Sequence, residues 1–289
     1  MSLRPYLRLT NPPIVVLLTF TALTAGIVGG GVQKPLLLLD VVVAIALCSM
    51  GARTLTNYVD RDMDARMTRT QSRPLPAGEV TPPVALAFGI GVTTVGLVSA
   101  VPLGWLYVLI IALGILDNVV VYNLLTKRRT HWNIVLAAPS GGVPALVGYA
   151  SMAGRIDVFA ILLMALVVLW TPIHIWSLAI RYREDYSRAD VPMLPVTLGV
   201  TAGIRWIAAT TLLLALFTVA LPFVPGTPFG YLTLIVAAVM GSALIVFSVA
   251  LLMSPTLVRA WRLFKFTSPY LAVLFTLLAM DVAVVHPPW

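Results

Sequence analysis

Acidic residues are few in this chain of 289 residues, and six of the 11 fall into two clusters, Asp60, Asp62 and Asp64 and then Glu184, Asp185 and Asp190. Helical steps of three and four residues place Asn57 or Thr56, Asp60 and Asp64 on one face of a helix. Oxygen ligands at this spacing suit a hard cation such as Mg²⁺, which usually completes its shell with water and substrate phosphate. The first cluster therefore predicts a magnesium site for a phosphate-bearing substrate.

Basic side chains follow the first cluster and recur on a later loop. Arg66, Arg69 and Arg73 come within nine residues of Asp64, and the run 127–129 is Lys-Arg-Arg. Taken alone, the run is also typical of a positively charged membrane anchor, and the arginines could simply neutralise the acids. Next to a metal, however, guanidinium and ammonium groups form a site for a diphosphate ester. We therefore predict that a diphosphate is bound by Arg66, Arg69, Arg73, Lys127 and Arg128.

The second acidic cluster follows an apolar stretch, 170–176, with the sequence WTPIHIW. His174 lies about two helical turns before Tyr182. A histidine inside an apolar span is either a functional group or a hydrogen-bonded packing residue, and the sequence leaves both open. Asp117 and Asp281 raise the same question, although Asp281 lies close enough to the end of its span to be solvated.

Composition limits what kind of protein can hold these groups. The chain is 60% apolar and 10% charged, with a formal charge of +8, whereas soluble domains are about 45–50% apolar and about 25% charged. A soluble globule, a disordered tail and a disulfide scaffold are excluded, the last because Cys48 is the only cysteine. A nucleic-acid binder would need a polar basic face, and none is present. The composition predicts an all-α, polytopic membrane protein.

A membrane-spanning helix needs about 20 apolar residues. This criterion predicts a single domain over 1–289 with nine spans, separated between the third and fourth by the segment 102–104. Of the 19 Lys and Arg residues, only Lys34 and Arg155 fall on one side of the membrane, so the N-terminus and the loops with the acidic clusters should be cytoplasmic and the C-terminus opposite. The predicted spans are 13–32, 37–58, 83–102, 104–123, 133–153, 157–180, 204–224, 230–252 and 268–286.

These motifs resemble those of the UbiA superfamily of intramembrane prenyltransferases. The stretch 58–64, YVDRDMD, followed by Arg69, Thr70 and the run RPLP at 73–76, matches the superfamily pattern. Within it, the heme O synthase (protoheme IX farnesyltransferase) branch is most similar, through KRRT at 127–130, His174 in its tryptophan-flanked stretch, and PMLP at 192–195. The resemblance covers essentially the whole chain.

The resemblance implies a nine-helix bundle around a cavity open to lipid, with Mg²⁺ as the cofactor. It implies transfer of a farnesyl group from farnesyl diphosphate to the vinyl group of protoheme IX, giving heme O that passes to downstream heme enzymes. Apolar walls would shield an allylic cation, with Trp170, Trp176 and Tyr122 as its aromatic neighbours. The implied metal ligands are Asn57, Asp60, Asp64 and Asp185. The implied acceptor-binding residues are His174, Trp176 and Tyr182. The implied catalytic residues are Asp60, Asp64, Asp185 and Lys127.

Two departures from the family pattern leave alternatives open. The family usually has Asn four residues before the first metal-binding Asp, where this chain has Thr56, and a basic residue where it has Asn11. One alternative is prenylation of an aromatic quinone precursor or another lipid-pathway acceptor. Another is a membrane transporter, which would place charges along a path across the bilayer. The prenyl chain length and the oligomeric state are not encoded in these motifs.

Overall fold

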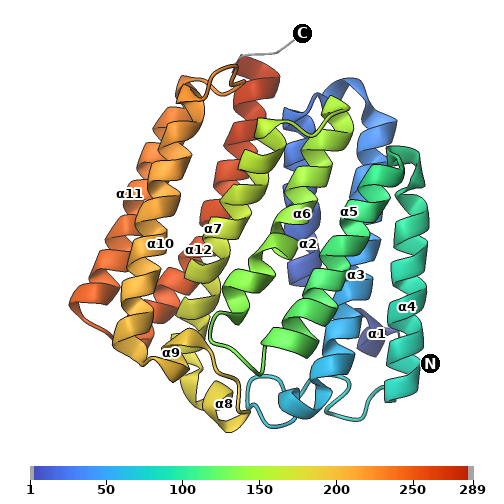
Figure 1. The fold of residues 1–289 in the computed structure, drawn as a ribbon, viewed down its shortest axis with the longest axis vertical. Coiled ribbons are helices and arrows are strands. Elements are labelled where there is room, and N and C mark those ends of the chain that lie inside the picture. Colours follow the sequence, from blue (N-terminus) through green and yellow to red (C-terminus); the bar gives the residue numbers. More distant parts are fainter. Residues whose placement is uncertain (1–2, 286–289) are drawn as a thin grey trace.

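The computed structural model describes residues 3–285, and this part of the chain is helical with no strand. Long helices run up and down the molecule, and short helices lie at its lower end (Figure 1). The helices are α1 Arg4–Leu9, α2 Pro12–Val28, α3 Pro35–Asp64, α4 Pro82–Ser99, α5 Trp105–Leu116, α6 Asn133–Ala153, α7 Val158–Arg181, α8 Arg183–Arg188, α9 Leu194–Thr197, α10 Val200–Ala220, α11 Tyr231–Met253 and α12 Leu257–Met280.

The predicted all-α membrane bundle is confirmed. Within the described residues, eight helices are long and apolar enough to cross a membrane, and α2, with 17 residues, is a shorter apolar helix. The first of the nine predicted spans corresponds to α2, and the predicted break at 102–104 separates α4 from α5. Many large apolar side chains on the outside, such as Leu109, Leu216 and Val239, are more than half exposed, as expected for a surface that faces lipid. The protein is an integral, multi-pass membrane protein.

The two largest differences from the predicted spans arise because a helix continues past the apolar residues. Helix α3 runs to Asp64 rather than ending at 58, so the first acidic cluster lies on the helix itself. Helix α12 begins at Leu257, not at 268, and its first turns carry Arg259, Arg262 and Lys265. An apolar-length criterion misses such charged ends, although their backbone is helical.

The fourth span changes its winding halfway along. Helix α5 continues into a π-helical segment, Asp117–Thr126, and the N–H of Lys127 donates to the carbonyl of Tyr122, five residues earlier. This winding is wider than the 3.6 residues per turn of an α-helix. Side chains four or five positions apart, namely Asn118, Asn123 and Lys127, therefore share one face of the segment.

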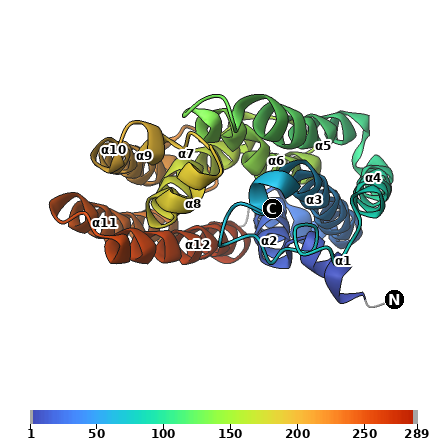
Figure 2. The same cartoon turned by 90° about the horizontal axis from the view of Figure 1, so that it is seen from below.

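The helices enclose an interior rather than forming a flat layer. Helix α2 packs against α3, α6 and α12, and α7 packs against α6, α10 and α12. Figure 2, seen from below, shows α12 beside α2, so the last helix closes the bundle against the first long one. The short helices α8 and α9 lie at the end of the bundle where α3 ends, and α12 finishes at the opposite end (Figure 1).

Asp281 has a structural role. It is fully buried, and its Oδ2 accepts from the backbone N–H groups of Gly230 (2.7 Å) and Thr233 (3.0 Å) and from the Thr233 hydroxyl (2.5 Å). These donors belong to the start of α11, where backbone N–H groups lack partners within the helix. The expectation of a solvated Asp281 is therefore wrong.

We expect Asp281→Ala to lower the free energy of unfolding in detergent by about 2–3 kcal/mol, because buried donors lose their acceptor. Chemical denaturation followed by circular dichroism measures this change. The exposed Asp62, replaced by Ala, is the control and should change stability little. Equal stabilities of the two variants would contradict the capping role.

Candidate active site

One cavity of about 360 Å³ runs through the interior of the bundle. At one end it is lined by Asp60, Asp64 and Lys127 together with Arg69 and Arg73. Farther in, its walls are mainly apolar and aromatic, and they include Ile45, Ile111, Trp170 and His174. The cavity therefore joins the first acidic cluster to the histidine of the second motif, which lies 110 residues later in the sequence.

The first carboxylate, Asp60, is paired with a lysine that directly follows the π-helical segment. Lys127 Nζ donates to Asp60 Oδ2 and, at 3.2 Å, to Asn123 Oδ1. Asp60 and Lys127 are both buried, whereas Asp60 Oδ1 has no hydrogen-bond partner within residues 3–285. Asn123, four residues before Lys127, therefore faces the end of α3 together with it.

The second carboxylate, Asp64, is paired with an arginine from the loop that follows α3. Arg73 donates to Asp64 Oδ2 at 2.7 Å and to Asn57 Oδ1 at 3.2 Å, and the Asn57 amide donates to the carbonyl of Leu9. The Thr56 hydroxyl turns back to the carbonyl of Arg53. The sequence left open whether Asn57 or Thr56 faces the predicted metal site. In the structure, the Asn57 oxygen accepts from the same arginine as Asp64, so Asn57 is the residue that lies beside this carboxylate.

Asp185 binds the loop after α3. Its two carboxylate oxygens accept from the backbone N–H groups of Thr68 (3.2 Å) and Arg69 (3.0 Å), and Arg188 lies 3.5 Å away. Burial raises the pKa of the Asp185 carboxyl, but the Arg69 and Thr68 hydrogen bonds and the Arg188 charge outweigh it and hold this pKa below its usual value. Asp185 is therefore ionised at neutral pH and fixes the backbone that carries Arg69 into the cavity.

We expect Asp185→Ala to raise the KM for the predicted phosphate-bearing substrate about tenfold, which is the lower end of the loss on removing a residue that supports a ligand-binding group. The loop would no longer be held by its two N–H bonds, so Arg69 would lose its position. Glu184→Gln, on the exposed side of the same short helix, is the matched control. Steady-state kinetics measure both variants, and an unchanged KM for Asp185→Ala would show that the loop is held by other contacts.

His174 occupies the inner part of the cavity wall. Its ring stacks between Trp170 and Phe264, with 4.4 Å between ring centroids on each side. Its Nδ1 lies 2.6 Å from the hydroxyl of Thr267 on α12. The histidine is therefore held in one plane by residues from two helices.

Other predicted site residues lie away from the cavity lining. Arg66 pairs with Asp190 at 2.8 Å, and Arg128 is exposed. Trp176 is buried in the helix core, and Tyr182 packs edge-on against Trp261 on α12. The structure thus brings together Asp60, Asp64, Arg69, Arg73, Lys127 and His174, and not Arg66, Arg128, Trp176 or Tyr182.

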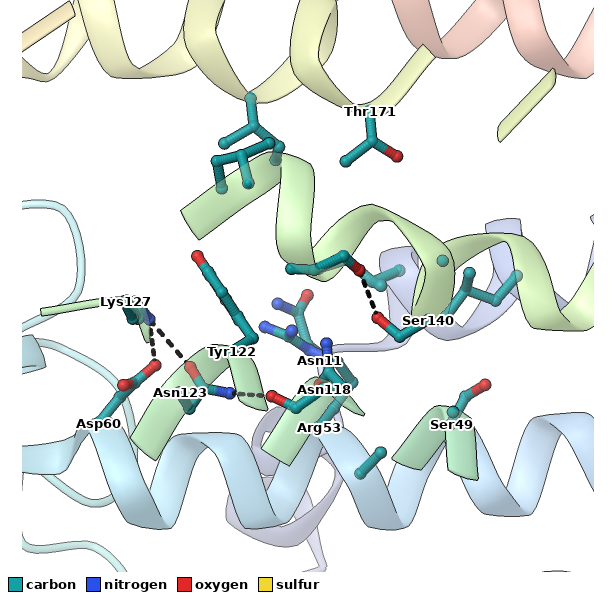
Figure 3. A pocket seen from close by; sticks show the side chains of 18 of the residues that line it. Asn11, Ser49, Arg53, Asp60, Asn118, Tyr122, Asn123, Lys127, Ser140 and Thr171 are labelled. Atoms are coloured by element: carbon teal, nitrogen blue, oxygen red, sulfur yellow. Dashed lines mark hydrogen bonds and ion pairs between the residues drawn. The ribbon is translucent and has the colours of Figure 1, made fainter. Parts of the chain in front are cut away.

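Two polar residues in the cavity wall, Arg53 and Asn118, were not singled out by the sequence analysis. Figure 3 shows Arg53, Asn118 and Asn11 close together, with Tyr122 between them and the Asp60–Lys127 pair. Arg53 Nε is buried and has no hydrogen-bond partner within the described part of the chain. An arginine inside a membrane span is a functional candidate, and its position seven residues before Asp60, two turns along the same helix face, is the signal that could have identified it.

The oxygen donors at this end of the cavity fit a divalent cation whose remaining ligands come from the substrate. Residues 3–285 contain no cluster of three or more His, Cys, Asp or Glu side chains that could hold a metal by themselves. Mg²⁺, however, is usually held by one or two carboxylates plus phosphate oxygens. Asp60, with its unpartnered buried oxygen, and Asp64 on the next turn supply two carboxylates of that kind.

Comparisons with known proteins find similar sequences and similar folds. The model of the UbiA prenyltransferase family matches residues 15–277. A protoheme IX farnesyltransferase of Desulforudis audaxviator is 44% identical over 285 residues, covering 96% of this chain and 88% of the relative. A solved structure of digeranylgeranylglyceryl phosphate synthase superposes with a TM-score of 0.77 at 19% identity, covering 97% of this chain and 98% of the other.

A second solved structure, of a UbiA homologue from Archaeoglobus fulgidus, was determined with GPP and Mg²⁺ bound. It superposes with a TM-score of 0.62 at 15% identity, and the match covers 95% of this chain and 99% of that one. At this level of identity the likeness establishes the fold.

Proposed function

This chain belongs to the UbiA prenyltransferase family and is a prenyltransferase, and from that premise we propose that it transfers a farnesyl group from farnesyl diphosphate to the vinyl group of protoheme IX, giving heme O. The observation that carries the proposal is the single cavity that joins a diphosphate-type end, with Asp60, Asp64 and Lys127, to His174 between two aromatic rings. The 44% identity to a protoheme IX farnesyltransferase supports this choice of acceptor.

The polar end of the cavity would bind the diphosphate. Asp60 and Asp64, with Asn57 beside them, would hold Mg²⁺, which when bound neutralises charge on the diphosphate oxygens. Asp185 contributes by holding the loop of Arg69. Arg69, Arg73 and Lys127 would donate to the phosphate oxygens, and the Arg53 guanidinium would face the leaving group from the membrane side. As the C1–O bond breaks, its electron pair leaves with the diphosphate, whose charge these cations stabilise.

The apolar part of the cavity would hold the prenyl chain and the porphyrin. C1 of the farnesyl group bonds to the terminal vinyl carbon, and the cation left on the adjacent carbon takes the oxygen of a water molecule, which loses a proton. Tyr122 and Trp170 line the cavity, and the face of an aromatic ring stabilises a nearby cation. His174 would orient the porphyrin by ligating its iron.

The distribution of basic residues supports a cytoplasmic location for the diphosphate-binding end of the bundle, with the C-terminus on the opposite side. Both substrates would then enter from the cytoplasm or the bilayer, and the product would leave toward downstream heme enzymes. The two acidic clusters lie at one end of the bundle rather than along a transmembrane path, which favours this enzyme over a transporter.

An acceptor competition tests the proposal. The purified protein in detergent is incubated with farnesyl diphosphate, Mg²⁺ and equal amounts of protoheme and an aromatic acid such as 4-hydroxybenzoate, and the products are separated by mass spectrometry. We expect a farnesylated, hydrated porphyrin and no prenylated acid. Prenylation of the acid alone would replace the heme assignment with the quinone-precursor alternative.

A further inference from the structure

The ring of His174 is fixed by its neighbours on α7 and α12. Trp170 lies almost parallel to it, at an interplanar angle of 18°, and Phe264 lies on the other face at 29°. The indole N–H of Trp170 donates to the backbone carbonyl of Thr267 at 2.7 Å, which ties the two helices together at the same level. With rings on both faces, the imidazole cannot turn over without displacing an aromatic side chain.

The hydroxyl of Thr267 defines which nitrogen of His174 carries the proton. Its oxygen lies 2.6 Å from His174 Nδ1 and also 2.6 Å from the backbone carbonyl of Phe264. A carbonyl only accepts, and a hydroxyl has a single hydrogen. The Thr267 hydroxyl therefore donates to Phe264 and must accept from His174, so Nδ1 carries the hydrogen.

The other nitrogen is left with a free lone pair. A neutral imidazole with hydrogen on Nδ1 has an unprotonated Nε2. Within residues 3–285, no hydrogen bond to Nε2 is present, and His174 lines the cavity. An Nε2 lone pair in a mostly apolar cavity is the group that a heme iron binds, and metal-ligating histidines usually have the other nitrogen hydrogen-bonded in this way.

We propose that Thr267 is a positioning residue that holds His174 as the Nδ1–H tautomer and so directs Nε2 to the iron of the porphyrin substrate. The inference rests on the proposed heme acceptor. It assigns a role to a residue 93 positions away from His174 in the sequence. Because Thr267 is fully buried and its hydroxyl bonds within α12, it makes no direct contact with substrate.

The test uses the full-length protein in detergent, titrated with ferric protoheme. Thr267→Val removes the hydroxyl while nearly keeping the shape, and the backbone carbonyl that accepts from Trp170 stays. Thr267→Ser keeps the hydroxyl. The matched control is Thr276→Val, an exposed threonine on the same helix whose hydroxyl also bonds back to a backbone carbonyl.

We expect Thr267→Val to bind heme about 10–100-fold more weakly, the range for removing the partner of a metal-ligating histidine. It should also shift the iron–histidine band in the resonance Raman spectrum of the ferrous form. Thr267→Ser and Thr276→Val should match wild type. His174→Ala should lose the histidine-ligated spectrum and regain it on addition of free imidazole.

Two results would overturn the inference. In one, Thr267→Val and Thr276→Val share the same heme affinity and iron–histidine band. In the other, His174→Ala keeps the wild-type spectrum, which leaves Thr267 no ligand to position. Product formation by the wild-type protein is followed in parallel and tests the proposed function separately. If wild type forms farnesylated heme and either of these results is obtained, only the role of Thr267 is refuted.

Discussion

Replacing Asp64 by Asn is expected to lower kcat about 10³-fold, the upper end of the loss seen when one charge-stabilising group is removed from an active site. Asp64 is 1% exposed, lies one turn after Asp60 on α3, and pairs with Arg73 at 2.7 Å. Asparagine keeps the size and an oxygen but removes the charge that holds a divalent cation. Single-turnover release of pyrophosphate, measured with saturating Mg²⁺, reports the loss directly.

Asp62→Asn is the matched control for this variant. Asp62 is on the same helix between the two carboxylates, but its side chain is 73% exposed and its arginine neighbour is 3.7 Å away. It should retain wild-type kcat. Wild-type turnover by Asp64→Asn would show that the metal is held elsewhere.

Asp60 needs a different design, because it is buried with Lys127. Removing one partner of a buried pair leaves an uncompensated charge, which costs about 3–5 kcal/mol. The double variant Asp60→Asn, Lys127→Met removes both charges and separates a loss of chemistry from a loss of folding.

His174→Ala should reduce kcat/KM for protoheme about 100-fold, the upper part of the range for a disrupted metal-ligand arrangement, while the KM for farnesyl diphosphate stays unchanged. The variant should affect protoheme and not farnesyl diphosphate, because His174 lies at the inner wall of the cavity and the carboxylates lie at its end. Varying each substrate in turn at saturation of the other measures both constants.

His131→Ala is the control for the histidine variant, since His131 is on the loop before α6 and is absent from the cavity lining. An equal loss in both variants would indicate a general effect on the protein. A rise in the KM for farnesyl diphosphate with His174→Ala would place His174 at the prenyl end instead.

Helical periodicity was sufficient to predict that the first acidic cluster shares one face of a helix. Asp60 and Asp64 follow Asn57 at steps of three and four, and α3 does continue through all of them. The spacing therefore put their side chains on one face before any tertiary contact was known. The pairing of these acids with Arg73 and Lys127 is visible only in the structure, where it gives each buried carboxylate the partner it requires.

Other parts of the site depend on local helical winding and on contacts between helices that are distant in the sequence. The π-helical turns that align Asn118, Asn123 and Lys127 could not be predicted from an apolar-length criterion, because that criterion measures the length of a span and not its helical winding. Thr267 reaches His174 only because α12 packs against α7. Asp185 was predicted as a metal ligand, whereas in the structure both of its oxygens bind backbone N–H groups of the loop after α3.

The central claim is that one cavity brings a prenyl diphosphate and a porphyrin together for reaction. A single-turnover experiment tests it most directly: protein loaded with protoheme is mixed with farnesyl diphosphate and Mg²⁺, and the porphyrin and the released pyrophosphate are quantified at the same times. The account predicts that the porphyrin gains one farnesyl group and one water in step with pyrophosphate release. Release of pyrophosphate with an unchanged porphyrin would contradict it.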